Sequence, residues 1–360
     1  MRLVVWLGVH PFHRRAGAEI DAECDLSCEL TLKPKPLRKY YDIFNGDADG
    51  LCALHQLRLA RPRHDESREL ITGVKRDIQL LSRPALRAAR AGDEITVLDI
   101  SHKSNAAALA ELLARGVKCQ YFDHHAAGMI PVHANLDAHI DTAPEVCTSL
   151  IVDKHLAGAH RLWAVVAAFG DNLVAPALRA AQPLDLDHTE LARLHELGDC
   201  LNYNAYGDTT DDLHYPPAEL YQTVAPYADP REFMIDEPVF DVLKEAMRED
   251  VERAEDIPPQ FADDSAALYV LPDAAWSRRV NGLFGNRLAL SNPGRAHAVL
   301  VSKADGYAVS VRAPVANPNG ADDLCACFDT GGGRKGAAGI NLLPQAQLAA
   351  FIDAFRAAYR

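Results

Sequence analysis

The strongest constraint on the fold is a regular alternation of short apolar runs and helix-period segments between Tyr40 and Asp123. The strand-like runs cover residues 40–46, 69–74, 94–100 and 117–123, and the helix-like segments cover residues 51–62, 84–91 and 105–116. Strand and helix in turn, with short connections, are typical of a parallel sheet covered by helices on both faces. The sequence therefore predicts an α/β fold built on a parallel sheet.

The rest of the chain divides into further parts. Apolar residues at helical spacing dominate residues 145–201, a long charged helix is expected at 240–256, and strand-like runs return from residue 265 onward. The first residues end in the proline-bearing spacer Lys33-Pro34-Lys35-Pro36 and make a poor secretory signal. We expect four parts: a poorly ordered leader (1–37), the main sheet domain (38–195), a helical connector (196–262) and a smaller α/β domain (263–360).

Charge and cysteine content narrow the class of protein. The chain has 37 Lys and Arg against 50 Asp and Glu, a formal net charge of −13. This excess argues against a protein that coats long nucleic acid, because such binding depends on neutralising phosphates. No apolar run approaches the roughly 18 residues of a membrane span. The eight cysteines include no CxxC pair, which favours buried thiols in a reducing compartment and hence a cytoplasmic protein.

Acidic residues and histidines stand where the predicted strands end. Asp47 and Asp49 follow the first strand, Asp99 ends another, the triplet 123–125 (Asp-His-His) ends a third, and Asp171 follows an apolar helix. Each has a structural alternative: a turn or helix cap at 47–50, a loop residue at 99, and an N-cap for the next helix at 171. Because parallel strands end at one edge of the sheet, where ligands bind, we expect these side chains to meet in one crevice.

Such a cluster has a specific chemistry. Carboxylates and imidazoles without a thiolate suit Mn²⁺ or Mg²⁺ and do not suit structural zinc. Without a cation the clustered carboxylates would repel one another, and some would have to take up protons. A bound metal can also generate hydroxide at neutral pH and neutralise the charge of a phosphoryl group. The sequence therefore predicts a divalent-metal site.

These motifs resemble those of the DHH phosphoesterase superfamily. The matching residues are Asp47-x-Asp49, Asp99, the triplet Asp123-His124-His125 and Asp171, and residues 332–339 (GGRKGAAG) resemble the GGHxxAAG loop of the associated DHHA1 domain. The resemblance covers about residues 40–172 and 263–345. It implies a Rossmann-like catalytic domain and a smaller C-terminal DHHA1-like α/β domain that face each other across a cleft.

The resemblance also implies roles for individual residues. Asp99 would bridge two metals, Asp49, His124 and Asp171 would complete one of them, and Asp47 would belong to the other. His125 would contact the scissile phosphate or protonate the leaving oxygen, and Asp123 would orient an imidazole. Substrate phosphate would be bound by the residues Gly332, Gly333, Arg334 and Lys335. The implied cofactor is Mn²⁺, as one or two ions, with Mg²⁺ or Co²⁺ as substitutes.

The sequence departs from the family pattern at two positions. Many members carry a histidine four residues before the first motif aspartate, where this chain has Ile43. Either the first metal binds weakly, or a neighbour such as His102 replaces the imidazole, or one ion suffices; the amide oxygen of Asn45 is a further candidate ligand. The GGH histidine is replaced by Arg334, whose guanidinium can bind a phosphate at two points.

The resemblance and the composition together favour one function. We expect a Mn²⁺-dependent phosphoesterase that hydrolyses phosphodiester or phosphomonoester bonds of short nucleotide-bearing substrates: oligonucleotides, dinucleotides or 3′-phosphoadenosine 5′-phosphate. The alternatives are a catalytically weakened nucleotide-binding or regulatory protein and a polyphosphate hydrolase. The expected partner is a nucleotide or a short single-stranded oligonucleotide rather than a membrane. A homodimer and an exonuclease-like polarity both stay open.

Overall fold

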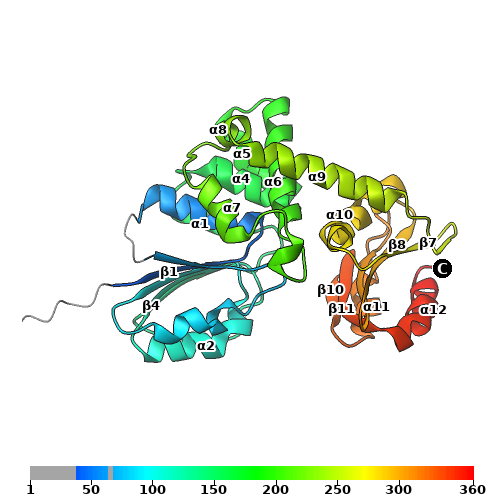
Figure 1. The fold of residues 1–360 in the computed structure, drawn as a ribbon, viewed down its shortest axis with the longest axis horizontal. Coiled ribbons are helices and arrows are strands. Elements are labelled where there is room, and N and C mark those ends of the chain that lie inside the picture. The colour runs from blue at the N-terminus through cyan, green and yellow to red at the C-terminus, as the bar shows by residue number, and fades with distance from the viewer. Residues whose placement is uncertain (1–37, 64–67) are drawn as a thin grey trace, which may run out of the picture. The chain divides into compact units, whose positions relative to one another are not determined.

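The computed structural model describes residues 38–63 and 68–360, so the leader expected over 1–37 lies outside the described residues. Its first part is a five-stranded, fully parallel sheet in the order β2-β1-β3-β4-β5 (Figure 1). The strands are β1 Tyr40–Phe44, β2 Arg68–Ile71, β3 Glu94–Leu98, β4 Lys118–Asp123 and β5 Leu136–Ile140. The predicted α/β class and its parallel sheet are confirmed.

This sheet separates two hydrophobic cores. Phe44, Leu98 and Phe122 lie side by side on β1, β3 and β4 and pack into one core with helices α1 (Ala48–Ala60) and α4 (Arg161–Gly170). The residue before each of them points to the other face, where the second core forms with α2 (His102–Ala114). Successive strand side chains alternate between faces, so one run of apolar residues fills both cores. Figure 1 shows α1 and α2 on opposite sides of the sheet.

Two local predictions in this part differ from the structure. The segment expected as a helix over 84–91 is only a short 3-10 turn, η2 Pro84–Ala88, which follows another, η1 Leu80–Ser82. The edge strand β5 was not expected. Its sequence, Leu-Asp-Ala-His-Ile, is half polar and only partly buried, as an edge strand permits, so it lacks the apolar run of the central strands.

Helices dominate the chain between the two sheets. They are α3 Thr148–His155, α4 Arg161–Gly170, α5 Val174–Ala181, η3 Gln182–Leu184, α6 His188–Asn204, η4 Thr210–Asp212, α7 Pro217–Val224, α8 Pro230–Asp236 and α9 Pro238–Glu255. The domain boundary expected at 195/196 falls inside α6.

Helices α4 and α6 approach each other closely at Gly170 and Gly198. A Cβ on Gly198 would lie 2.3 Å from the Val166 carbonyl oxygen and 2.7 Å from the Gly170 nitrogen.

Replacing Gly198 with Ala is therefore expected to lower the free energy of unfolding by about 1–3 kcal/mol, because the added methyl group must push two helix backbones apart. Gly170 directly precedes Asp171, so the shift should also weaken metal binding. Chemical denaturation measures the first effect. The matched control is Gly285→Ala in another helix, where the nearest atoms to an added Cβ lie 3.6 Å away or farther and little or no loss is expected. Equal stability of the two variants would contradict the close approach.

The second part is a mixed sheet in the order β10-β11-β9-β8-β7-β6. Its elements are β6 Phe261–Ala262, β7 Ala266–Leu271, α10 Ala275–Ser291, β8 Ala296–Lys303, β9 Gly306–Arg312, α11 Ala321–Ala326, β10 Gly331–Arg334, β11 Ala337–Pro344, η5 Gln345–Gln347 and α12 Leu348–Ala358. Helix α10 packs into a core on one face and α12 into a core on the other. A second, smaller α/β region is thus present, as expected.

The glycine-rich segment 331–339 forms an antiparallel hairpin rather than a loop. Gly332 on β10 pairs with Gly339 on β11, and Gly333 has a φ of +150°, which an L side chain rarely adopts. A Cβ on Gly333 would also lie 2.4 Å from the Cα of Ala338. Glycine is therefore required at position 333 by the close approach of two strands.

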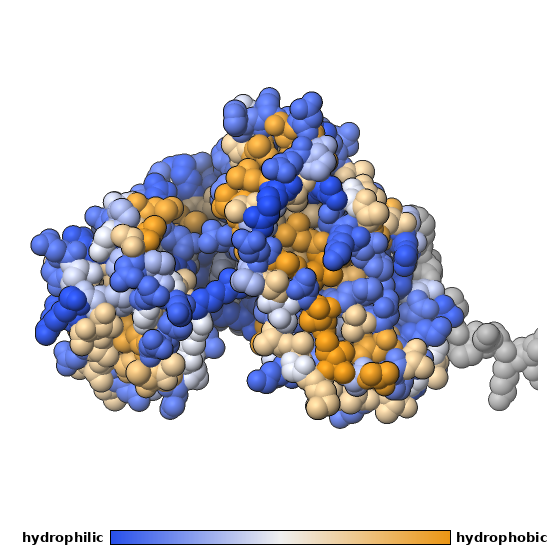
Figure 2. Space-filling view, turned by 180° about the vertical axis from the view of Figure 1, so that it is seen from behind, coloured by the Kyte–Doolittle hydropathy of each residue, from blue (hydrophilic) through white to orange (hydrophobic). Residues whose placement is uncertain are grey.

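The surface mixes hydrophilic and hydrophobic residues, as the face drawn in Figure 2 shows. Among the described residues, every helix is too short or too polar to cross a lipid bilayer.

Candidate metal centre

The predicted acidic residues lie at the carboxyl edge of the first sheet, each placed by the end of an element. Asp47 is the N-cap of α1, and its Oδ1 accepts hydrogen bonds from the backbone nitrogens of Asp49 and Gly50. Asp99 follows β3 directly with a φ of +59°, a left-handed conformation that aspartate tolerates better than most residues. Asp171 is the C-cap of α4, whereas Leu173 is the N-cap of α5. The helix-cap alternative therefore holds for Asp47 but not for Asp171.

His124 stands at the centre of the cluster. Its Nε2 lies 3.4 Å from Asp99 Oδ1, 3.8 Å from Asp171 Oδ2 and 4.0 Å from Asp49 Oδ2. These separations are long for hydrogen bonds. Two donors that bind one ion at about 2.0–2.2 Å lie about 3.0 Å apart at right angles and about 4.2 Å apart when opposite. Donor atoms of Asp49, His124 and Asp171 all lie within 4.8 Å of one another, and so do those of Asp99, His124 and His125. His124 is therefore shared by two groups of side chains that are spaced as ligands of an ion.

The tautomer of His124 suits this arrangement. Its Nδ1 lies 2.8 Å from the Val146 carbonyl oxygen, which can only accept a hydrogen bond, so the proton sits on Nδ1. The Nε2 lone pair is left free and points at the carboxylates. A backbone carbonyl behind a ligating histidine is a common way to fix its tautomer and orientation.

The charge balance of the cluster calls for a cation. Burial and the charges of Asp49, Asp47 and Asp171 raise the pKa of Asp99 well above its ordinary value. Burial likewise raises the pKa of Asp171. A divalent ion would remove this repulsion and keep the carboxylates ionised.

Asp49 has a second function that the sequence did not indicate. Its two carboxylate oxygens accept hydrogen bonds of 2.7 Å from the backbone nitrogens of Thr148 and Ser149, the first residues of α3. The Thr148 hydroxyl donates to Asp99 Oδ1 over 3.0 Å. A helix N-terminus attracts a negatively charged group, so α3 fixes the Asp49 carboxylate in place.

Asp123 and His125 form a pair beside the cluster. The fully buried carboxylate of Asp123 accepts from the His125 ring at Nδ1 over 2.7 Å and from the His125 backbone nitrogen over 3.2 Å. Burial acts to lower the pKa of His125, but this hydrogen bond and the nearby negative charges raise it overall. His125 Nδ1 also lies 3.8 Å from Asp99 Oδ1, but it is committed to Asp123. We therefore favour Asp49, Asp99, His124 and Asp171 as the ligand set.

Two other candidates lie differently from expectation. His102 is fully buried, its Nδ1 lies 2.6 Å from the Ala127 carbonyl oxygen, and its ring packs against Tyr121, so the structure does not bring it into the cluster. Its backbone nitrogen instead donates to Asp123. Asn45 is buried beside the cluster: its Nδ2 donates to the Lys75 carbonyl oxygen, and its Oδ1 has no partner among the described residues.

Lys75 is the residue that the sequence analysis missed. Its Nζ forms an ion pair with Asp47 Oδ2 and lies 3.4 Å from Asp171 Oδ1. Burial acts to lower the pKa of Lys75, but the charges of Asp47, Tyr206 and Asp171 raise it well above its ordinary value. A signal was available: Lys75 follows β2, so it stands at the same sheet edge as the predicted acids.

The predicted phosphate-binding residues are not in contact with this centre. Arg334 and Lys335 are exposed and have no side-chain hydrogen bond or ion pair with any described residue. A cavity of about 220 Å³ does reach the cluster, and it is lined by Lys75 and Asp171 from the first part and by Arg279 and Arg312 from the second. The Arg312 guanidinium is held by Asn286, Ser310 and the Gly282 carbonyl oxygen.

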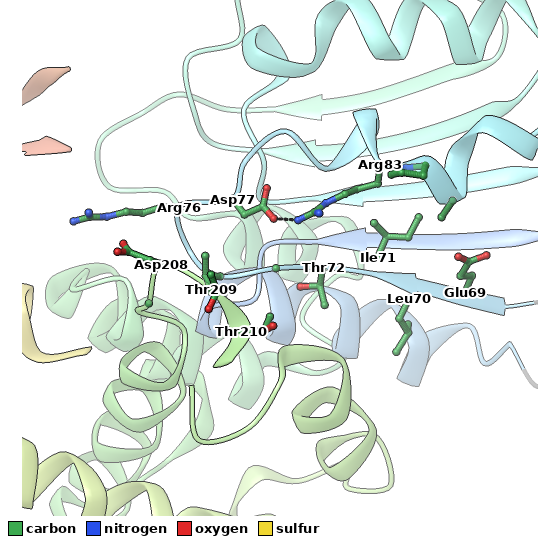
Figure 3. Close-up of a pocket in the computed structure, with 15 residues that line it drawn as sticks. Glu69, Leu70, Ile71, Thr72, Arg76, Asp77, Arg83, Asp208, Thr209 and Thr210 are labelled. Carbon is green, nitrogen blue, oxygen red and sulfur yellow. Dashed lines mark hydrogen bonds and ion pairs between the residues drawn. The ribbon is translucent and has the colours of Figure 1, made fainter. Parts of the chain in front are cut away.

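A second cavity lies elsewhere. It measures about 830 Å³ and runs along the end of β2 past Arg76, Asp77 and Arg83 to residues 207–210 (Figure 3). Arg83 is paired with Asp77 there. None of the ligand candidates lines it, so the smaller cavity is the one that connects to the metal centre.

Comparison with solved structures shows what this architecture resembles. The chain superimposes on exonuclease RecJ bound to manganese with a TM-score of 0.58 at 17% identity, over 89% of this chain and 90% of that one. RecJ from Thermus thermophilus in complex with Mn²⁺ gives 0.57 at 16% identity, over 89% of this chain and 52% of that one. A DHH domain described as belonging to a family of ribosomal proteins gives 0.59 at 14% identity, over 89% and 86%. No protein-family model and no curated protein matches the chain.

Proposed function

Since the described chain has the fold of the DHH/DHHA1 phosphoesterase superfamily, we propose that it is a divalent-metal-dependent phosphoesterase. Its proposed substrates are short and nucleotide-bearing, and the bond it hydrolyses is a phosphodiester or a phosphomonoester. The proposed cofactor is Mn²⁺, which the two RecJ structures contain, with Mg²⁺ or Co²⁺ as substitutes.

One observation carries the proposal: the free Nε2 of His124 faces three carboxylates at 3.4–4.0 Å. Shorter separations would indicate a hydrogen-bonded structural cluster, and longer ones would leave an ion without ligands. Asp49, Asp99, His124 and Asp171 would hold the ion, which when bound supplies an activated water and positive charge for a phosphoryl group.

Other residues of the chain would position the ligands and supply a proton. The Val146 carbonyl and the N-terminus of α3 orient His124 and Asp49 before any ion binds. Asp123 keeps a proton on His125 Nδ1 and holds the ring at the edge of the cluster. The side chain of His125 is 39% exposed, so it can reach a substrate and donate a proton to a leaving oxygen.

The size of the connected cavity supports a small substrate. Its volume of about 220 Å³ falls below the roughly 300–1,000 Å³ of pockets that enclose drug-sized ligands. It has room for one small group of a substrate. The net charge of −13 points the same way, because a long polyanion would be repelled.

A substrate panel tests this function. The purified chain is incubated in Mn²⁺ with dinucleotides, single-stranded oligomers, 3′-phosphoadenosine 5′-phosphate and polyphosphate. We expect turnover of at least one short nucleotide substrate and none of polyphosphate. Nucleotide binding without hydrolysis of any phosphoester would instead support a regulatory protein.

Replacing Arg334 with Ala is expected to raise the Michaelis constant for substrates with a terminal phosphate about 5- to 10-fold, because one charged hydrogen-bond donor pair is lost. The turnover number should change little, since Arg334 does not contact the metal centre. Steady-state kinetics measure both constants. Arg193→Ala, at an exposed arginine on α6 without an ion-pair partner among the described residues, is the control. An unchanged Michaelis constant would remove Arg334 from substrate binding.

A further inference from the structure

Three side-chain oxygens surround the ammonium group of Lys75, much as ligands surround a metal ion. Its Nζ lies 2.5 Å from Asp47 Oδ2, 3.0 Å from Asn202 Oδ1 and 3.4 Å from Asp171 Oδ1. An ammonium group has three N–H donors and no acceptor. Three oxygens from three separate elements therefore match its full bonding capacity.

The backbone fixes Lys75 independently of these ion pairs. Its nitrogen donates to the Ala205 carbonyl oxygen over 2.9 Å, and its carbonyl oxygen accepts from Asn45 Nδ2 over 3.2 Å. Its Nζ also lies 5.6 Å from the centre of the Tyr206 ring. The side chain is only 22% exposed, so the ammonium group is not a surface charge that swings in by chance.

Both oxygens of Asp47 already accept hydrogen bonds from the chain itself. Oδ1 accepts from two backbone nitrogens and Oδ2 from Lys75. Among the described residues, two groups of side chains are spaced closely enough to hold a metal, and Asp47 belongs to neither. They are Asp99, His124 and His125, and Asp49, His124 and Asp171. Four residues before Asp47, Ile43 is buried in the hydrophobic core and offers no donor atom.

We propose that the Lys75 ammonium group is a built-in cation that stands where a second metal ion would bind, so that this centre holds one divalent ion. The proposal rests on the metal centre of the proposed function and specifies its composition. A second ion on the Asp47 side would have to displace the ammonium group or lie against it, and like charges at such short range repel strongly. Lys75 then supplies the fixed positive charge on that side, and the single ion lies among Asp49, Asp99, His124 and Asp171.

Counting bound Mn²⁺ tests the proposal without reference to activity. The full chain is stripped with a chelator and titrated with Mn²⁺, and free ion is followed by its electron paramagnetic resonance signal. We expect one Mn²⁺ per wild-type chain. Lys75→Met, which keeps the length of the side chain and removes its charge, is expected to bind two. Lys244→Met, at a lysine paired with Glu196 on another helix, is the matched control and should bind one.

The outcomes separate the two proposals. Two Mn²⁺ per wild-type chain would overturn the role of Lys75 and leave the phosphoesterase proposal intact. One ion in both the wild type and Lys75→Met would also overturn it, because the lysine would then not be what excludes the second ion. No bound Mn²⁺ in the wild type would defeat the metal centre itself. Circular dichroism checks that Lys75→Met is folded, and Lys75→Gln replaces it in the comparison if it is not.

Discussion

Replacing Asp99 with Asn is expected to reduce Mn²⁺-dependent hydrolysis by about 10³-fold or more, which corresponds to about 4 kcal/mol of transition-state stabilisation. Asp99 Oδ1 lies 3.4 Å from His124 Nε2, at the centre of the proposed ligand set. Asparagine keeps the shape of the side chain and tolerates the left-handed backbone at this position. The variant therefore removes a charged ligand with little disturbance of the fold.

The same substitution should not destabilise the metal-free protein. Burial and the neighbouring carboxylates raise the pKa of Asp99, so its negative charge is unfavourable when no cation is bound. We expect an unchanged or higher melting temperature without metal, and loss of the stabilisation that Mn²⁺ gives the wild type. The control is Asp185→Asn, because Asp185 is an exposed aspartate that also has a positive φ, of +50°. Retained activity in Asp99→Asn would show that the metal centre is misassigned.

Replacing Asp123 with Asn is expected to lower the turnover number about 10- to 100-fold and to leave Mn²⁺ binding unchanged. The buried Asp123 carboxylate accepts from both the ring and the backbone of His125 and from the backbone of His102. An asparagine can keep the oxygen toward His102, but its NH₂ group would then face the Nδ1–H of His125. The ring would have to move its proton to Nε2 or turn away from the cluster.

Kinetics and metal titration distinguish this positioning role from a role in metal binding. A matched control is Asp137→Asn, which disrupts another aspartate–histidine pair, with His139 on the edge strand β5, outside the ligand set. It should leave the turnover number within about twofold of the wild type. If Asp123→Asn instead lost Mn²⁺ and kept its turnover number at saturating metal, Asp123 would support the ligands rather than His125.

The sequence predicted the sheet and the meeting of the acids because both follow from short-range rules. Apolar runs mark central strands, and parallel strands place their ends at one edge, so Asp47, Asp99 and His124 could be grouped without coordinates. Strand β5 was missed because its half-polar sequence does not carry that signal. The hairpin at 331–344 was expected as a loop because glycines suggest turns, whereas here they permit close strand pairing.

The same rules place Lys75 at the sheet edge, but they do not find Arg312. Carboxylates and imidazoles at strand ends indicate a metal site, whereas a lysine at the same edge is not a metal ligand and gives no such indication. Arg312 lines the same cavity as Asp171 only through the packing of helices and of a second sheet, which no local sequence pattern encodes. Asp49 was predicted as a ligand, but its second role was not. Its carboxylate also caps the N-terminus of α3, a contact between residues about 100 positions apart in the sequence.

The most direct test of the metal-dependent phosphoesterase is a chelation and add-back experiment on a dinucleotide. The purified chain is assayed after EDTA treatment and again after stepwise addition of Mn²⁺, with product release followed by chromatography. We predict no turnover in EDTA and recovery that follows Mn²⁺ binding. Full turnover in the presence of the chelator, or none with Mn²⁺ bound, would contradict the account.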